Sequence, residues 1–441
     1  MRRSLVSSSQ SRRQPKPTGR AWASLGTSLN FIVTGFTWLI ASLLPGMALI
    51  LGLVYGTPLP RWLRPLHVHG ALVGGILQLA IGGLLVSIAY SSNRKDASAQ
   101  TRRALFLTWN AGTAVLLLGF WLENMPIVGF AGLLLSVAVL SFSKTAWVHF
   151  GHAAGVGWIY RIALAALLGG LAAGMAMAFR LTNGYYAHAR LAHVHLIVLG
   201  CLTLGFIVVF YEFLPLLLRT PPAGMGKARF ALWVLPAGFA ALLAGFLMSA
   251  VWLQLAVGWL LLSSIALVFF HSVRSWLSAG SPGTAATDHL LIGALFLLVA
   301  TASGLAMGTN YLSNPPFLPI GSLHMVAYTH LAFIGFLTQM VCGSLSYVMP
   351  DLLATTRVHN HSKQQAYRMQ LDGIMNRWRI VQLAGLSLGT IALPVLAALT
   401  WIVPLGSVYV QSAAWFATGL LFASLMLFAV KLARAVAFQP S

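Results

Sequence analysis

The stretch HVHGALVGGILQLAIGG at residues 67–83 decides the fold, because the chain repeats its design twice more. The later copies are HVHLIVLGCLTLGF at 193–206 and YTHLAFIGFLTQMVCG at 328–343. In each copy, two positions separated by one residue open an apolar run, and a glycine follows the second position five residues later. The copies begin 126 and 135 residues apart, so we predict a chain built from three similar thirds.

The composition places the chain in a membrane. Hydrophobic residues make up 58% of the 441 residues and charged residues only 7%, whereas soluble domains have about 25% charged residues. Both cysteines, Cys201 and Cys342, lie in apolar runs, which excludes a disulfide framework or a cysteine-based zinc site. The net charge of +21 is explained by basic cytoplasmic loops, so we predict the lipid bilayer as a partner and no nucleic acid.

Apolar windows of about 20 residues predict twelve spans, and so an all-α polytopic membrane protein. Three repeats of four helices predict three four-helix arcs around a pseudo-threefold axis. The predicted spans are 29–55, 66–90, 104–122, 126–142, 154–178, 191–217, 229–250, 252–272, 288–311, 323–349, 379–401 and 409–433. The predicted parts are a disordered basic tail at 1–28, a membrane domain at 29–436 with repeats at about 29–142, 154–272 and 288–433, and a polar loop at 351–378.

The distribution of lysine and arginine orients the bundle. Alternate segments between the spans, counted with the adjoining ends of the spans, hold 22 of these cations, the other segments hold only 4, and Arg161 lies well inside a span. Positive charge accumulates on cytoplasmic loops. We therefore predict that both termini and the 351–378 loop are cytoplasmic, in a bacterial inner membrane. The three histidine-bearing helices then all begin at the outer face.

The histidine spacing has a geometric consequence. Residues two apart on an α-helix point about 200° apart around the axis, so the two imidazoles of one His-x-His must serve different pockets. Three such helices around an axis would form three pockets, each bordered by the first position of one helix and the second position of a neighbour. The six positions are His67, His69, His193, His195, Tyr328 and His330.

Ligation of haem iron is the interpretation that these positions favour. Ionisable groups in hydrocarbon are rare and usually functional, and imidazole on both faces of a haem makes a low-spin centre suited to electron transfer. Core histidines satisfied by hydrogen bonds are the alternative for any one of them. The chain has no Cys-x-x-Cys-His, so covalent haem attachment is not predicted.

Around the second, sixth and tenth spans, the sequence resembles subunit I of the haem–copper oxidases and nitric oxide reductases. That family has twelve helices in three arcs, with a histidine opening helix 2 and His-x-His opening helix 10. His330 matches the low-spin haem ligand of helix 10, because it precedes Pro350 by the family's interval and GSLSYVMP resembles the family's helix end. The resemblance implies that His67 or His69 supplies the other ligand. A cyclic register then pairs His67 with His330, His69 with His193, and His195 with Tyr328.

Departures from the family bear on catalysis. The family's copper takes one histidine from helix 6 and a pair from helix 7, but the seventh span, RFALWVLPAGFAALLAGFLMSA at 229–250, has no histidine. Tyr328 stands where the family has the ligand of its active haem, and His324, one turn earlier, is a possible substitute. Of the acidic residues, only Glu212 is predicted inside the membrane. We therefore do not expect copper, or catalysis by this chain itself.

These observations predict an electron-transfer subunit of a respiratory membrane complex that binds one b-type haem or two. The expected partners are other subunits and a periplasmic cytochrome c or a similar redox protein. His67 and His330 are the strongest candidates for the ligands of the first haem iron. His69 and His193 are the candidates for a second haem. Two alternatives stay open: a terminal oxidase or nitric oxide reductase with an atypical centre of His193, His195, His324 and Tyr328, and a haem-free scaffold.

Overall fold

A computed structural model describes the backbone of residues 19–91, 98–151, 157–219 and 226–440. Twelve helices in these ranges are long and apolar enough to cross a membrane, which confirms the predicted polytopic helical class and the number of spans. The split predicted at Asn124-Met-Pro126 is also present, because one helix ends at Trp121 and the next begins at Met125. The three arcs about a pseudo-threefold axis stay a prediction.

Every described element is helical. In the first third the elements are α1 (Gly19–Ala41), α2 (Leu43–Tyr55), α3 (Leu63–His69), the π-helix η1 (Gly70–Leu77), α4 (Gln78–Ser91), α5 (Ala99–Trp121) and α6 (Met125–Gly151). In the second they are α7 (Gly157–Ala178), the 3₁₀ turn η2 (Asn183–Tyr185), α8 (Tyr186–His195), the π-helix η3 (Leu196–Thr203), α9 (Leu204–Leu218), α10 (Gly226–Leu247) and α11 (Val251–Ser278). In the third they are α12 (Ala285–Asn310), α13 (Ser322–His330), the π-helix η4 (Leu331–Thr338), α14 (Gln339–Arg357), α15 (His361–Asn376), α16 (Arg379–Leu399) and α17 (Val408–Ala437).

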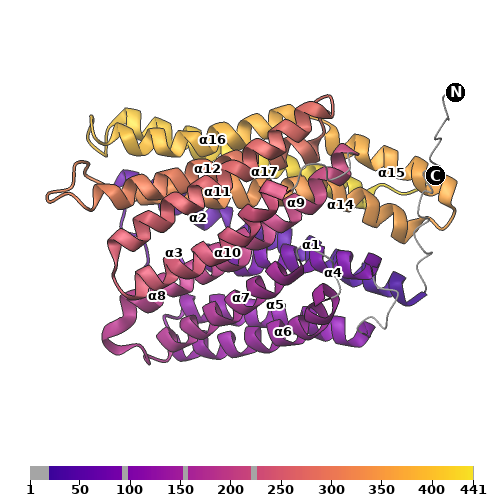
Figure 1. Cartoon of the computed structure of the whole chain (residues 1–441), viewed down its shortest axis with the longest axis horizontal. Helices are drawn as coiled ribbons and strands as arrows, with labels where there is room; N and C mark the ends of the chain where they lie inside the picture. Colours follow the sequence, from indigo (N-terminus) through magenta and orange to yellow (C-terminus); the bar gives the residue numbers. More distant parts are fainter. Residues whose placement is uncertain (1–18, 92–97, 152–156, 220–225, 441) are drawn as a thin grey trace, which may run out of the picture.

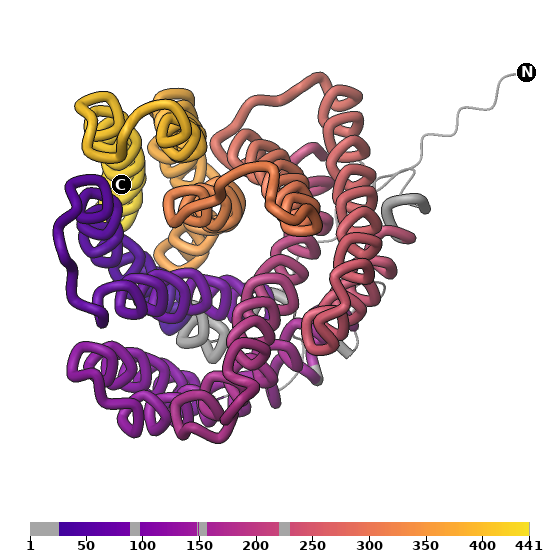
Figure 2. Tube along the Cα trace, turned by 90° about the vertical axis from the view of Figure 1, so that its left-hand side faces the viewer, coloured from indigo at the N-terminus to yellow at the C-terminus, as the bar shows by residue number. Residues whose placement is uncertain are grey.

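The helices run roughly parallel to the long axis of the molecule. In Figure 1, α8 lies at the left-hand end and α15 and the C-terminus lie at the right-hand end. Figure 2 shows the same helices end-on, and the chain proceeds around the molecule until the yellow C-terminal helices stand beside the indigo N-terminal ones. This closure is a packing contact, since α17 packs against α1 and α2.

A local pattern recurs in all three thirds. In each third, the first membrane-spanning helix packs along the π-helix that lies within the second membrane-spanning helix. The pairs are α1 with η1, α7 with η3, and α12 with η4. Each π-helix is eight residues long and begins immediately after the second position of a predicted pair, namely His69, His195 or His330. The sequence repeat therefore corresponds to a repeated local geometry.

Two predicted boundaries need correction. Residues 1–18 of the predicted tail lie outside the described residues, but α1 already begins at Gly19, ten residues before the predicted first span. The predicted 351–378 loop is mostly helical: residues 351–357 continue α14, and α15 occupies most of the remainder. The reason is amphipathicity, because Tyr367, Leu371 and Met375 recur every four residues and are buried against α14 and α17.

Candidate functional site: facing histidines at the predicted outer ends of the helices

The structure brings His67 of α3 and His330 of α13 together. Their ring centroids are 6.4 Å apart and the ring planes differ by 8°. These residues are 263 positions apart in the chain, and the cyclic register predicted this pairing. The separation exceeds face-to-face van der Waals contact, which is about 3.5–4.0 Å between carbon atoms. The two parallel imidazoles therefore lie close together without face-to-face contact.

A second pair has nearly the same geometry. His69 of α3 and His193 of α8 have ring centroids 6.2 Å apart and an interplanar angle of 25°. The predicted divergence of a His-x-His pair is thus confirmed, because His67 and His69 face partners on two different helices. The α3 helix contributes one ring to each pair.

Hydrogen bonds fix the tautomer at the first position of each His-x-His. The Nδ1 atom of His67 lies 2.8 Å from the carbonyl oxygen of Ser42, and that of His193 lies 2.8 Å from the carbonyl oxygen of Gly170. A carbonyl oxygen can only accept, so Nδ1 carries the hydrogen and Nε2 keeps its lone pair. Both carbonyls belong to the first spanning helix of the same third, although Ser42 lies at the break between α1 and α2.

The second positions reach the same tautomer by a different route. His69, His195 and His330 each donate from Nδ1 to the carbonyl four residues earlier in their own helix, at Pro65, Leu191 and Val326. The distances are 2.8, 2.8 and 2.7 Å. A backbone carbonyl on Nδ1 is the usual outer-shell partner of a metal-ligating histidine, since it orients the ring and raises the basicity of Nε2. In all five predicted histidines, Nε2 is therefore the ring nitrogen whose lone pair could bind a metal ion.

Glycines in the neighbouring helix make room for the first-position rings. A Cβ at Gly46 would overlap Cε1 of His67, and one at Gly174 would lie 3.0 Å from Cε1 of His193. In the last third, a Cβ at Gly304 would lie 2.8 Å from the hydroxyl oxygen of Tyr328. Each ring thus packs directly on helix backbone. Sequence reasoning missed these three glycines, although they follow one another at 128 and 130 residues, close to the 126 and 135 residues that separate the first positions of the pairs.

Side-chain hydrogen bonds mark the ends of two of the three π-helices. In a π-helix the carbonyl bonds five residues ahead, which places different side chains on the inner face. Thr203 and Thr338 close η3 and η4, and each hydroxyl donates 2.8 Å to the carbonyl five residues earlier, at Val198 and Phe333. Such π segments are frequent at functional sites.

The remaining two predicted positions have other neighbours. His195 packs on Phe246 of α10, with ring centroids 4.3 Å apart. His69 has the matching contact with Phe120 of α5, at 4.6 Å, and each phenylalanine follows its histidine by 51 residues. Tyr328 contacts α12 at Gly304. Among the described residues, His195 and Tyr328 do not form a ring pair like the first two.

His324 differs chemically from the paired histidines. Its Nδ1 accepts a hydrogen bond of 3.1 Å from the backbone N–H of Gly321, so the neutral ring carries its hydrogen on Nε2 and has no lone pair there. The ring stacks on Trp401, with centroids 4.8 Å apart and an angle of 23°. These contacts cap the start of α13 and leave His324 poorly suited to the ligand role that the sequence allowed for it.

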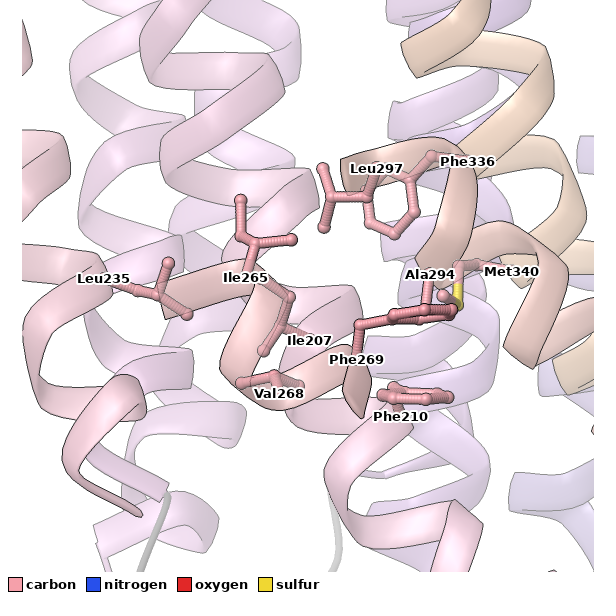
Figure 3. Close-up of a pocket in the computed structure, with 10 residues that line it drawn as sticks. All are labelled: Ile207, Phe210, Leu235, Ile265, Val268, Phe269, Ala294, Leu297, Phe336 and Met340. Carbon is pink, nitrogen blue, oxygen red and sulfur yellow. The ribbon is translucent and has the colours of Figure 1, made fainter. Parts of the chain in front are cut away.

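The described residues contain no cluster of three or more His, Cys, Asp or Glu side chains that could hold a metal ion. Figure 3 shows a cavity next to η4 that is lined only by apolar side chains, among them Phe210, Phe269, Phe336 and Met340. It offers no polar ligand. The paired histidines are therefore the groups in the described part of the chain that best combine ligand chemistry with matched geometry.

Comparison with known proteins adds no functional assignment. No protein-family model matches the sequence, and no curated protein is similar to it at a significant level.

Proposed function

We propose that the chain binds b-type haem between His67 and His330 and acts as an electron-transfer subunit in a membrane. The observation that carries the proposal is the pair of parallel imidazoles 6.4 Å apart. Metal–imidazole bonds are about 2.0–2.1 Å, as they are for zinc, so two rings that pointed Nε2 at one metal ion would have centres about 6.4 Å apart. The spacing between the rings therefore fits one metal ion with two imidazole ligands.

The chemistry of the donor set supports the same proposal. Both rings donate from Nδ1 to a backbone carbonyl, at Ser42 and Val326, which leaves Nε2 as the free donor atom of each. Haem supplies reversible one-electron chemistry when bound, and two imidazole ligands leave its iron no open position for a substrate. The histidine residues would fix the ligands in place, and the burial of the bundle would exclude water.

His69 and His193 support a second haem of the same type. Their centroid separation of 6.2 Å and their Nδ1 bonds to Pro65 and Gly170 reproduce the first pair. Because His67 and His69 are two residues apart on α3, two haems held in this way would be close neighbours. The α3 helix would then supply one ligand to each of the two haems.

The setting of the proposal is a respiratory membrane complex. The cation distribution supports cytoplasmic termini in a bacterial inner membrane, with the histidine pairs near the outer face. A periplasmic cytochrome c or a similar redox protein would then be the partner on that face, and other membrane subunits would complete the complex. The resemblance to subunit I of the haem–copper oxidases fits this setting.

The experiment is a reduced-minus-oxidised spectrum of the purified chain with pyridine haemochrome quantitation. The wild type should show a low-spin b-type spectrum with one or two haems per chain. His67→Ala and His330→Ala should each lose the same haem, because each removes one ligand of one iron. If two haems are present, His69→Ala and His193→Ala should remove the other.

The matched control is His361→Ala, which alters an exposed histidine at the start of α15. It should leave the spectrum unchanged. A purified wild-type chain without a Soret band would contradict the proposal, as would spectra that are the same in wild type and His330→Ala.

A further inference from the structure

A lysine side chain is buried in the last helix, far in sequence from the histidine pairs. Lys431 of α17 is only 3% exposed, and it lies in a helix apolar enough to span the membrane. The distribution of cations along the sequence predicted that Lys431 belongs to the cytoplasmic side. In the structure α17 continues past it to Ala437, and the side chain is buried. Ionisable residues inside a membrane are expensive and mark functional sites by default.

The hydrogen bonds of Lys431 leave donors unused. Its Nζ donates 2.7 Å to Oε1 of Gln382 on α16, and an ammonium group has three N–H donors. Gln382 is 1% exposed, and its Nε2 atom is buried with no hydrogen-bond partner in the protein. One positive charge and several N–H donors are thus enclosed together without an acceptor for all of them.

Among the described residues, Lys431 forms no ion pair with a carboxylate, and three aspartates pair with arginines instead. Arg368 pairs with Asp351 at 3.0 Å and lies 4.0 Å from Asp372, and Arg379 pairs with Asp288 at 3.2 Å. A cation–π contact with Phe428, 5.9 Å from Nζ to the ring centroid, compensates the ammonium charge only in part. A buried charge needs a counter-charge or hydrogen-bonded partners to be stable.

The neighbouring helix α12 adds a third unsatisfied group. His289 is fully buried, and its Nδ1 donates to Oε1 of Gln339, the first residue of α14. Its Nε2 is buried without a partner in the protein, and the ring interacts electrostatically with Lys431. Buried groups in this condition indicate an ion or water that completes their hydrogen bonds. A water next to His289 would satisfy Nε2 and still contact an ion at Lys431.

We propose that Lys431 and Gln382 form a binding site for a small monovalent anion of halide type inside the bundle. The anion would accept from Nζ of Lys431 and Nε2 of Gln382, and it would neutralise the buried ammonium charge. Close packing limits the size of the ion, because a Cβ at Gly385, one turn from Gln382, would overlap the hydroxyl of Ser424 on α17. This site is independent of the haem proposal.

The test is the thermal stability of the purified full-length chain, followed by tryptophan fluorescence. Chloride or bromide replaces gluconate at constant ionic strength and pH. A ligand that binds only the folded state stabilises it as its concentration exceeds Kd. The melting temperature of the wild type should therefore rise with halide and then saturate.

Two variants identify the site. Lys431→Met should lose the halide dependence, and Gln382→Glu should also lose it, because the new carboxylate supplies the counter-charge internally and keeps the fold. The control Lys363→Met changes an exposed lysine of α15 and should respond to halide as the wild type does. A wild type without halide dependence would overturn the proposal, and so would full dependence in Gln382→Glu.

Discussion

At the residue scale, the hydrogen on Nδ1 decides what each histidine can do. The five histidines at the predicted pair positions donate from Nδ1 to a carbonyl and keep a lone pair on Nε2. His324 accepts at Nδ1 instead. The sequence offered all six histidines as candidate ligands, but the backbone geometry that separates His324 from the others is visible only in three dimensions.

The glycines under the first-position rings give a prediction at this scale. Gly46→Ala should displace His67, because a Cβ there overlaps Cε1 of the ring, and overpacking costs about 1–3 kcal/mol. We expect a lower melting temperature and loss of the haem that His67 binds. Haem content and thermal unfolding measure the two effects.

Gly419→Ala is the matched control for that substitution. Gly419 also lies within a membrane helix, α17, but a Cβ there meets nothing within 4 Å. Alanine favours helix over glycine, so this variant should be unchanged or slightly stabilised. Equal loss of haem in both variants would show that the ring contact at Gly46 has no special role.

The pairing of rings could be predicted from residues, but their support could not. The repeat register, together with the family resemblance, predicted His67 with His330 and His69 with His193, and the structure brings both pairs together. Their role as ligands stays a prediction. The carbonyls of Ser42 and Gly170 carry no side-chain signal, because any residue has a carbonyl and only the helix geometry selects which one faces the ring.

At the scale of elements, α15 shows where composition misleads. Its sequence is polar enough to suggest a loop. However, Asn360 caps the helix through its side-chain oxygen, and three side chains spaced four residues apart are buried. The π-helices were also beyond sequence reasoning, since an apolar run has no feature that distinguishes them from α-helix. Only their position, directly after each pair, connects them with the repeat.

The ion pairs of α15 give a pH-dependent prediction. Burial raises the pKa of Asp372; nearby Arg368 lowers it, and Asp351 raises it further. A carboxyl whose pKa is raised in the folded state destabilises the fold when charged, and this cost disappears as the pH falls through the folded pKa. Asp372→Asn should therefore raise the melting temperature at pH 7 more than in acid. A uniform effect at all pH values would contradict this account of Asp372.

At the scale of the whole molecule, the number and limits of the spans were the most predictable features. Twelve apolar helices follow from the thickness of the bilayer, and each predicted span coincides with one of them within several residues. Their placement around the molecule was not predictable to the same extent, because lateral packing depends on side-chain shape. The even number of spans places both ends of the described chain on one side.

Orientation gives a prediction for the whole molecule. Phe317 lies between α12 and α13 and is 82% exposed, and Met369 on α15 is 62% exposed. Phe317→Cys should react with a membrane-impermeant maleimide in intact cells, whereas Met369→Cys should react only after the membrane is opened. The natural cysteines lie within membrane helices, with Cys342 buried and Cys201 half-buried. The reverse labelling pattern would refute the predicted cytoplasmic termini.

Low-temperature electron paramagnetic resonance of the oxidised, purified chain tests the central claim most directly, because its spectrum depends on both axial ligands of haem iron and on the angle between them. Ring planes that differ by 8° and 25° predict rhombic low-spin ferric signals of bis-imidazole type, and His330→Ala should abolish the signal that arises from the 8° pair. A protein without ferric haem, or one with only a high-spin signal, would contradict the assignment of these histidines as paired ligands.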